Sequence, residues 1–403
     1  MFSNKKVLLV TTVSGFIPQF EMNNVRLLQS MGCEIHYAAN YHTPSYGNDN
    51  HRLDHTGIFR HQIDFVRSPF QPANLTAYRQ LKALMSHYHF DLIHCHTPMG
   101  SVLARLAAHA TKTSPVIYTA HGFHFYSGAP VVNWLFYYPV EKLLSRYTDQ
   151  QICINHEDYQ RAKTKFHAHY TDYIPGVGID LNRKELHQTI DITKKKKELG
   201  LPLNKKILLS SGELIKRKNH ETVIRALAQL KNKFDDFHYI ICGHGVLNDY
   251  LHTLAKQLDI ADRVTFLGYR NDIFEIYQIA DLFVFPSFQE GLPMALLEAM
   301  ASGLPVVCSN IRGCSDLMSI ERKDDLIYCK GGIMTKKAAD VSAYCKALSY
   351  ILTHSNPVSE MGNYNKNHVS AFRSELVTEK MEHIYQRLLK YRLTIRWGCC
   401  KSR

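Results

Sequence analysis

The sequence predicts an α/β protein built from two doubly wound parallel-sheet domains. Short apolar runs that suit buried parallel strands alternate with stretches of helical length from the N-terminus onward. A strand, a loop, a helix and a second strand follow one another without interruption between residues 282 and 308. The length of 403 residues suits two such domains better than one.

The first half of the chain shows this alternation clearly. The predicted strands are 7–10, 34–38, 91–96 and 116–119, and the predicted helices are 20–31, 74–87, 100–109 and 141–147. Aromatic residues crowd the segment 123–138, which predicts a buried helix face, with a lipid-facing or acceptor-facing rim as the alternative. A single glycine, Gly15, lies in the loop after the first strand.

Histidines gather where two of these strands end. His94 and His96 close one strand, while His121 and His124 follow the next. No carboxylate stands at ligand spacing from them, so the sequence predicts no metal site. Because α/β sheets bind ligands at the carboxyl ends of their strands, His121, which follows a strand end, is a candidate for a functional side chain. The other three are expected to be hydrogen-bonded strand-end or loop residues.

A turn-rich stretch at 173–180 marks the predicted domain junction, which gives domains 1–178 and 179–374. The basic run 194–197 that follows is interpreted as a solvated helix end. Beyond it, a strand at 206–210 leads into a loop that contains Gly212 and the adjacent cations Lys216, Arg217 and Lys218. Cations between a strand and a helix N-terminus suit a diphosphate, although such a run is also common in solvated loops.

Two further strand ends carry glycines. Gly243 and Gly245 follow the strand 239–242, but a third glycine and a downstream acid are missing, so they are not a dinucleotide fingerprint. Gly268 and Tyr269 close the next strand, 263–267.

The segment 285–307 is the most informative one. Glu290 lies in a polar loop, and Glu298 lies in a helix that is predicted to begin at Pro293 and to end at Gly303. With Glu290 outside the helix, both carboxylates can face one binding site next to a helix N-terminus, which favours phosphate or sugar hydroxyls. The alternative is that Glu290 is a loop carboxylate that helps to cap the helix and that Glu298 is a solvated charge on the helix.

Composition narrows the class of protein. Hydrophobic residues make up 45% and charged residues 21%, as in ordinary globular proteins. The chain enters a strand soon after its first residues without a signal peptide, and its ten cysteines form no disulfide or zinc pattern, which predicts a reduced, cytoplasmic protein. The net charge of +12 favours a membrane surface or a diphosphate substrate over nucleic acid, since no nucleic-acid-binding motif accompanies it; a basic surface that only keeps the protein soluble is the alternative.

The segment around Glu290 and Glu298, with its Glu-Gly-Leu-Pro and Ala-Ser-Gly-Leu-Pro-Val-Val, resembles the Glu-x7-Glu signature of family 4 retaining nucleotide-sugar glycosyltransferases. That family has the GT-B fold, in which two Rossmann-like domains face each other across a cleft and a last helix, here about 375–393, returns to the first domain. The segment 121–159 resembles the branch that assembles bacterial capsule and exopolysaccharide repeat units. The residues that carry this second likeness are Gly122-Phe123-His124-Phe125-Tyr126, Tyr137-Tyr138-Pro139, Glu141-Lys142 and Ile154-Asn155-His156-Glu157-Asp158-Tyr159.

The resemblance implies a role for each matching position. Glu290 would orient the donor sugar, Glu298 would hold the ribose, and His121 would line the reaction centre. Arg217 and Lys218 would bind the donor diphosphate in place of a metal ion, so no cofactor is expected. Many family members carry an arginine directly after the glycine where this chain has Glu213, so the choice among Lys216, Arg217 and Lys218 stays open. The other implied donor-binding residues are Gly15, Gly212, Gly243, Gly268, Tyr269, Gly291, Leu292 and Pro293.

The implied function is transfer of a sugar from a nucleoside-diphosphate donor, with uridine diphosphate favoured, to a polyprenyl-diphosphate-linked sugar acceptor. The implied place is the inner face of the cell membrane, with peripheral contact to anionic lipid and no nucleic-acid partner. Two alternatives remain: a nucleotide-sugar epimerase of the same fold, and a non-catalytic basic protein that binds nucleic acid or membrane.

Overall fold

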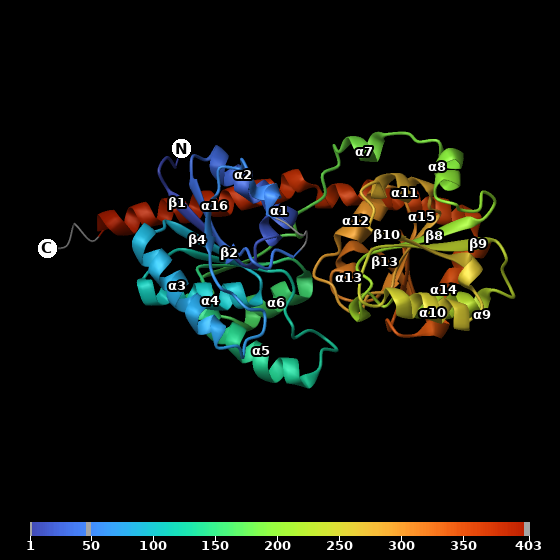
Figure 1. The fold of residues 1–403 in the computed structure, drawn as a ribbon, viewed down its shortest axis with the longest axis horizontal. Coiled ribbons are helices and arrows are strands. Elements are labelled where there is room, and N and C mark those ends of the chain that lie inside the picture. The colour runs from blue at the N-terminus through green and yellow to red at the C-terminus, as the bar shows by residue number, and fades with distance from the viewer. Residues whose placement is uncertain (1, 46–49, 399–403) are drawn as a thin grey trace. The chain divides into compact units, whose positions relative to one another are not determined.

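The computed structural model describes residues 2–45 and 50–398 (Figure 1). The chain divides into two compact units. The first unit comprises Met1–Gly178 together with Ser374–Arg403, and the second comprises Ile179–Arg373.

The first unit is built on a seven-stranded parallel sheet with the order β3-β2-β1-β4-β5-β6-β7. Its strands are β1 (Lys6–Val13), β2 (Glu34–Asn40), β3 (Phe59–Gln62), β4 (Leu92–His96), β5 (Val116–Ala120), β6 (Gln150–Cys153) and β7 (Tyr170–Tyr173). Its helices are α1 (Phe16–Phe20), α2 (Met22–Ser30), α3 (Ala73–Tyr88), α4 (Pro98–Thr111), α5 (Val131–Leu144), α6 (His156–Lys165) and α16 (Ser374–Gly398).

Helices cover both faces of this sheet, so its inner strands are buried on two sides, which explains their apolar runs, whereas the edge strands β3 and β7 are partly exposed (Figure 1). One face packs against α3, α4 and part of α5. The other packs against α2 and the returning helix α16, which contributes Val377, Met381, Ile384, Tyr385, Leu388 and Leu389 to the core.

Two helices of the first unit differ from the sequence-based prediction. The helix expected over 20–31 begins at Met22 as α2, and a separate short helix, α1, ends at Phe20, which leaves Glu21 between the two helices. The helix expected over 141–147 begins ten residues earlier, as α5, and carries the aromatic segment and Pro139 within it. The part of the aromatic segment from Val131 to Tyr138 is therefore helical and belongs to α5.

The second unit holds an eight-stranded sheet with the order β10-β9-β8-β11-β12-β15-β14-β13. Its strands are β8 (Lys206–Ser211), β9 (Phe237–Cys242), β10 (Val264–Gly268), β11 (Leu282–Phe285), β12 (Val306–Ser309), β13 (Ile320–Lys323), β14 (Ile327–Cys329) and β15 (Gly332–Thr335). Neighbours from β10 to β15 in this order are parallel, and the β15-β14-β13 edge is antiparallel. Its helices are α7 (Lys184–His187), α8 (Ile192–Glu198), α9 (His220–Leu230), α10 (Asn248–Gln257), α11 (Ile273–Ile279), α12 (Met294–Ala301), α13 (Cys314–Leu317), α14 (Val341–Thr353) and α15 (Ser355–His368).

The basic run 194–197 is a solvated helix end only in part, because Lys194 and Lys197 are exposed whereas Lys195 and Lys196 are buried. It lies on α8, where Lys195 is only 8% exposed. Its ammonium group lies 2.7 Å from a carboxylate oxygen of both Asp272 and Glu275. Buried charges require such partners, and these partners lie far along the chain, so the run alone does not reveal them.

Candidate functional site

Three of the predicted site residues meet at the ends of β8 and β11 in the second unit. Glu290 follows β11, and its Oε1 accepts hydrogen bonds from Arg217 Nη1 at 2.9 Å and from Lys218 Nζ at 2.8 Å. The Glu290 side chain is 10% exposed, Lys218 is 12% exposed and Arg217 is 39% exposed. One carboxylate thus holds two cations side by side at the carboxyl edge of the sheet.

Backbone contacts fix this arrangement. The Phe288 N–H donates to the Arg217 carbonyl at 2.8 Å, and Arg217 Nη1 also donates to the Gln289 carbonyl at 3.1 Å. The two loops that follow β8 and β11 therefore hold each other in place. Of the three adjacent cations, Arg217 and Lys218 are the two that contact the Glu290 carboxylate, and Lys216 is not part of this contact.

The glycines of the neighbouring strand ends allow the loops to pack closely. The Gly243 N–H donates to the Gly268 carbonyl at 2.7 Å. Gly243 has φ +149°, and a Cβ there would lie 1.9 Å from the Gly212 carbonyl oxygen, so a side chain is excluded. The Tyr269 N–H donates to His244 Nε2 at 3.2 Å, while the Tyr269 side chain is 71% exposed. Gly212, Gly243, Gly268 and Tyr269 are therefore one group of adjoining loops.

Glu298 lies on α12 and has different neighbours. The helix begins at Met294 with Pro293 as its N-cap, one residue later than predicted. The Tyr277 hydroxyl donates to Glu298 Oε2 at 3.3 Å. Burial raises the pKa of the Glu298 carboxyl, an effect that the Tyr277 hydrogen bond and the positive charge of Arg183 oppose. Glu298 is thus a half-buried carboxylate held by an aromatic hydroxyl, not the solvated helix charge of the alternative interpretation.

The loop 290–293 before α12 is closely packed as well. Gly291 presents its carbonyl to Gly313, where a Cβ would come within 2.2 Å of that oxygen. Arg312 Nε donates to the Glu290 carbonyl at 3.3 Å. Leu292 is buried beside this turn. These contacts hold the loop that carries the Glu290 carboxylate.

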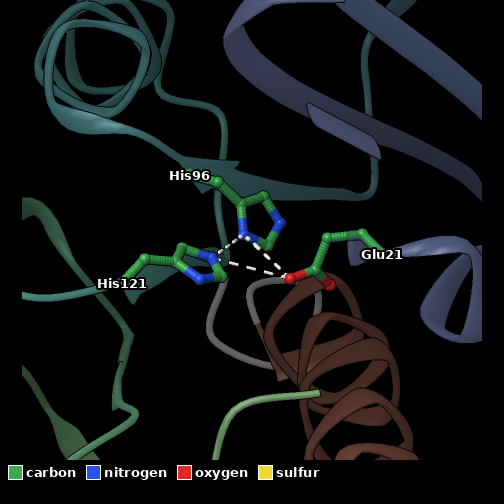
Figure 2. A group of neighbouring side chains, drawn as sticks. All are labelled: Glu21, His96 and His121. Atoms are coloured by element: carbon green, nitrogen blue, oxygen red, sulfur yellow. Dashed lines mark hydrogen bonds and ion pairs between the residues drawn. The ribbon is translucent and has the colours of Figure 1, made fainter. Parts of the chain in front are cut away.

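The first unit contains a second cluster, at the carboxyl ends of β4 and β5 (Figure 2). Glu21, His96 and His121 point toward one another there. His96 Nδ1 and His121 Nε2 share a hydrogen bond of 3.1 Å, and Glu21 Oε1 lies 3.6 Å from each of these nitrogens. His96 and Glu21 are buried, whereas the His121 side chain is 25% exposed. Gly15 adjoins this cluster through Phe16, whose ring packs edge-on against His121.

Burial controls the charge of this cluster. It lowers the pKa of His121 to about 4 and holds that of His96 well below its usual range. It also raises the pKa of the Glu21 carboxyl to about 7, although the hydrogen bond from Asn24 opposes that shift. Both imidazoles are therefore neutral at neutral pH, with one acceptor nitrogen each.

Sequence reasoning missed Glu21. No carboxylate stands at ligand spacing from the histidines along the sequence, but the break between α1 and α2 places Glu21 beside His96 and His121 at the ends of β4 and β5. His94 matches its predicted role, since its ring nitrogens bond to the Tyr385 hydroxyl and to Thr119 Oγ1, both at 2.8 Å.

Known proteins resemble this chain over almost its whole length. The family model described as glycosyl transferases group 1 matches residues 191–368, and the model described as glycosyl transferase 4-like matches residues 6–155. The putative glycosyltransferase EpsD of Bacillus subtilis is 36% identical over 387 residues, which cover 94% of this chain and 96% of that protein. An Escherichia coli protein, UDP-Gal:alpha-D-GlcNAc-diphosphoundecaprenol alpha-1,3-galactosyltransferase, is 31% identical over 64% of this chain and 70% of its own.

Solved structures share the fold at lower identity. HepE from Anabaena, in a complex with UDP and glucose, has a TM-score of 0.73 at 19% identity and covers 95% of this chain and 100% of its own. WaaG, a glycosyltransferase involved in lipopolysaccharide biosynthesis, has a TM-score of 0.69 at 15% identity over 94% of this chain and 99% of its own. These likenesses show the GT-B fold. Among the helices in the described part of the chain, none combines the length and apolar character that crossing a membrane requires.

Proposed function

The chain belongs to the group 1, family 4-like glycosyltransferases, and we propose that it transfers a sugar from a nucleoside-diphosphate donor, with retention of configuration, to a lipid-diphosphate-linked saccharide. The favoured donor nucleotide is uridine diphosphate. The observation that carries this proposal is the group of Arg217, Lys218 and Glu290 at one edge of the second sheet.

The chemistry follows from the charges of that group. A departing nucleoside diphosphate gains negative charge on its β-phosphate, and two fixed cations stabilise that charge without a metal ion. Glu290 holds both cations in place before the donor arrives and orients the donor sugar afterwards. Glu298 binds the ribose hydroxyls. His121, uncharged at neutral pH, acts as a hydrogen-bonding group rather than as a second cation.

The donor half of the proposal is tested by ligand-induced thermal stabilisation with UDP, GDP, ADP and their sugar conjugates, with and without chelator. We expect one nucleotide to raise the melting temperature equally in both conditions. The double variant Arg217→Ala, Lys218→Ala should lose that shift, while Lys216→Ala should keep most of it. No shift with any nucleotide would contradict the proposal. A product formed from the donor without any acceptor would favour an epimerase of the same fold.

Support for a lipid-linked acceptor comes from the relatives and from the surface of α5. The names of the Escherichia coli relative and of a Campylobacter jejuni relative, 38% identical over 27% of this chain, both specify a diphospho-undecaprenol substrate. Along α5, one helix face consists of apolar side chains that are between 43% and 73% exposed. They are Val131, Val132, Leu135, Phe136, Val140 and Leu143, which we call the α5 apolar face.

The α5 apolar face suits a membrane surface. Its members recur at helical spacing, while the opposite side of α5 packs on the core of the first unit. The cationic side chains of Lys142 and Arg146 follow at the C-terminal end, and the whole chain carries a net charge of +12. An apolar helix face with basic neighbours binds the interface of anionic lipid. We therefore propose peripheral attachment to the cytoplasmic face of the membrane through this helix.

Sedimentation with lipid vesicles tests the attachment. The native chain should pellet with vesicles that contain anionic lipid, and much less with zwitterionic ones or at high salt. The double variant Leu135→Glu, Phe136→Glu should remain in the supernatant. Val246→Glu is the matched control, because Val246 is 88% exposed in the second unit. Equal pelleting of both variants would contradict the assignment of α5.

A further inference from the structure

We propose that Glu21, His96 and His121 form a binding site for one divalent transition-metal ion of the zinc class, with a fourth coordination position left open. The sequence predicts no metal there, and the transfer reaction proposed above does not use one. The proposal rests on the geometry of the first unit alone.

The distances between the three candidate ligand atoms match those of a tetrahedral zinc site. Zinc binds imidazole nitrogen at about 2.0–2.1 Å and carboxylate oxygen at about 2.0–2.2 Å, so neighbouring ligand atoms of a tetrahedron lie about 3.3–3.5 Å apart. Here the nitrogens of His96 and His121 are 3.1 Å apart, and each lies 3.6 Å from Glu21 Oε1. An ion would need to move these atoms by only a few tenths of an ångström.

A hydrogen-bonded network accounts for these distances less well. One imidazole N–H satisfies the 3.1 Å contact between the two rings. Glu21 Oε1, however, is equidistant from both nitrogens at 3.6 Å, which is longer than a hydrogen bond to either. A carboxylate oxygen placed symmetrically against two imidazole nitrogens is what a shared cation requires. Two imidazoles and one carboxylate also form the donor set of many catalytic zinc sites.

The surroundings hold the ligands in place. Asn24 Nδ2 donates to Glu21 Oε2 at 2.6 Å, which orients the carboxylate and leaves Oε1 directed at the histidines. The His96 ring lies tilted against the His94 ring with their centroids 4.1 Å apart, and Phe16 packs against both His96 and His121. Such outer contacts fix ligand geometry in metal sites. The partly exposed His121 gives the open side through which an ion enters.

An ion at this position would join three segments that are distant in sequence: the turn between α1 and α2, the end of β4 and the residue after β5. Because the unfolded chain does not hold these groups together, metal binding would stabilise the first unit. We therefore expect Zn²⁺ to raise the melting temperature of the chelator-treated protein.

The experiment uses the full chain with Cys399→Ser and Cys400→Ser, which removes the adjacent thiols of the C-terminal end as competing ligands. After chelator treatment, Co²⁺ is added and the visible spectrum is recorded. Zn²⁺ bound per chain is measured after gel filtration. We expect the intense bands of four-coordinate Co²⁺ without a thiolate charge-transfer band, and one Zn²⁺ per chain.

Glu21→Gln and His96→Asn should each weaken Zn²⁺ binding by at least about tenfold. Both should keep the metal-free melting temperature near that of the parent chain, and both should keep the UDP-induced shift, since Arg217 and Lys218 lie in the other unit. His124→Asn, which changes a nearby histidine outside the cluster, should bind Zn²⁺ normally. A silent Co²⁺ spectrum, a thiolate band, or unchanged Zn²⁺ affinity in both ligand variants would overturn the proposal, whatever the outcome of the nucleotide experiment.

Discussion

Replacing Glu290 with glutamine should separate donor binding from catalysis. The carboxylate binds Arg217 at 2.9 Å and Lys218 at 2.8 Å, and a donor diphosphate must compete with it for both cations. Ion pairs near a protein surface contribute about 0.2–1 kcal/mol each. Removing both pairs therefore leaves about 0.4–2 kcal/mol more for the diphosphate, which is a gain of about 2- to 30-fold in affinity for the nucleotide.

Turnover should change in the opposite direction. If Glu290 orients the donor sugar, the amide misplaces the reacting carbon, and a displacement of about 1 Å costs about 100-fold in rate. The assay combines calorimetric titration of the nucleotide with initial rates of sugar transfer. Glu213→Gln is the control, because that carboxylate is 62% exposed and 3.9 Å from Arg217. Wild-type turnover in Glu290→Gln, or weaker nucleotide binding together with a lower melting temperature, would refute this reasoning and leave Glu290 with a structural role.

Three further predictions concern stability. Glu141→Gln should lower the free energy of unfolding by about 3–5 kcal/mol, measured by urea denaturation. The reason is that the fully buried Arg105, which lies 2.8 Å from the Glu141 carboxylate, would lose its counter-charge. Equal stability of the variant would contradict a buried ion pair. Burial lowers the pKa of His238 to about 4, so the stability that the neutral imidazole contributes is complete above pH 6.5 and is lost as the pH falls toward 4. His238→Gln should therefore reduce the acid-induced loss of unfolding free energy by up to about 3 kcal/mol, measured from urea midpoints across this pH range. A pH profile equal to that of the parent chain would refute the prediction. Gly243→Ala should lower the free energy of unfolding by about 1–3 kcal/mol, because the new Cβ would displace the Gly212 carbonyl. It should also reduce the nucleotide-induced rise in melting temperature. A wild-type melting curve would show that the loops can adjust.

Local sequence patterns predict the features of this molecule that depend on residues close together in the chain. The buried strands appear as apolar runs because helices cover both faces of each sheet. Glu290 is predictable because β11, its loop and α12 are consecutive, with Gly303 ending the helix. The glycosyltransferase family and the GT-B fold follow from the same segment, and the comparisons confirm both.

Contacts between distant segments are not predictable in this way. Glu21 reaches the histidines only because β1 lies beside β4 in the sheet and α1 ends one residue before Glu21. Lys195 is buried by Asp272 and Glu275, which follow much later in the chain. The apolar residues of α5 suggest a core helix, and nothing in their spacing shows that six of the ten face solvent. The roles of the individual site residues remain predictions.

The return of α16 to the first unit also has a consequence for synthesis on the ribosome. Strands β1 to β7 are complete at Tyr173, but one face of their sheet is covered by side chains from Val377 to Leu389. At about 5–20 residues per second, the ribosome needs roughly 10–40 s to make the intervening second unit. During that time the apolar side chains beneath α16 are exposed, and the His94 ring lacks the hydroxyl of Tyr385. The nascent first unit is therefore a natural client for chaperones until the last helix emerges, and a nonsense codon before Ser374 would leave it unfinished even though its whole sheet had been translated.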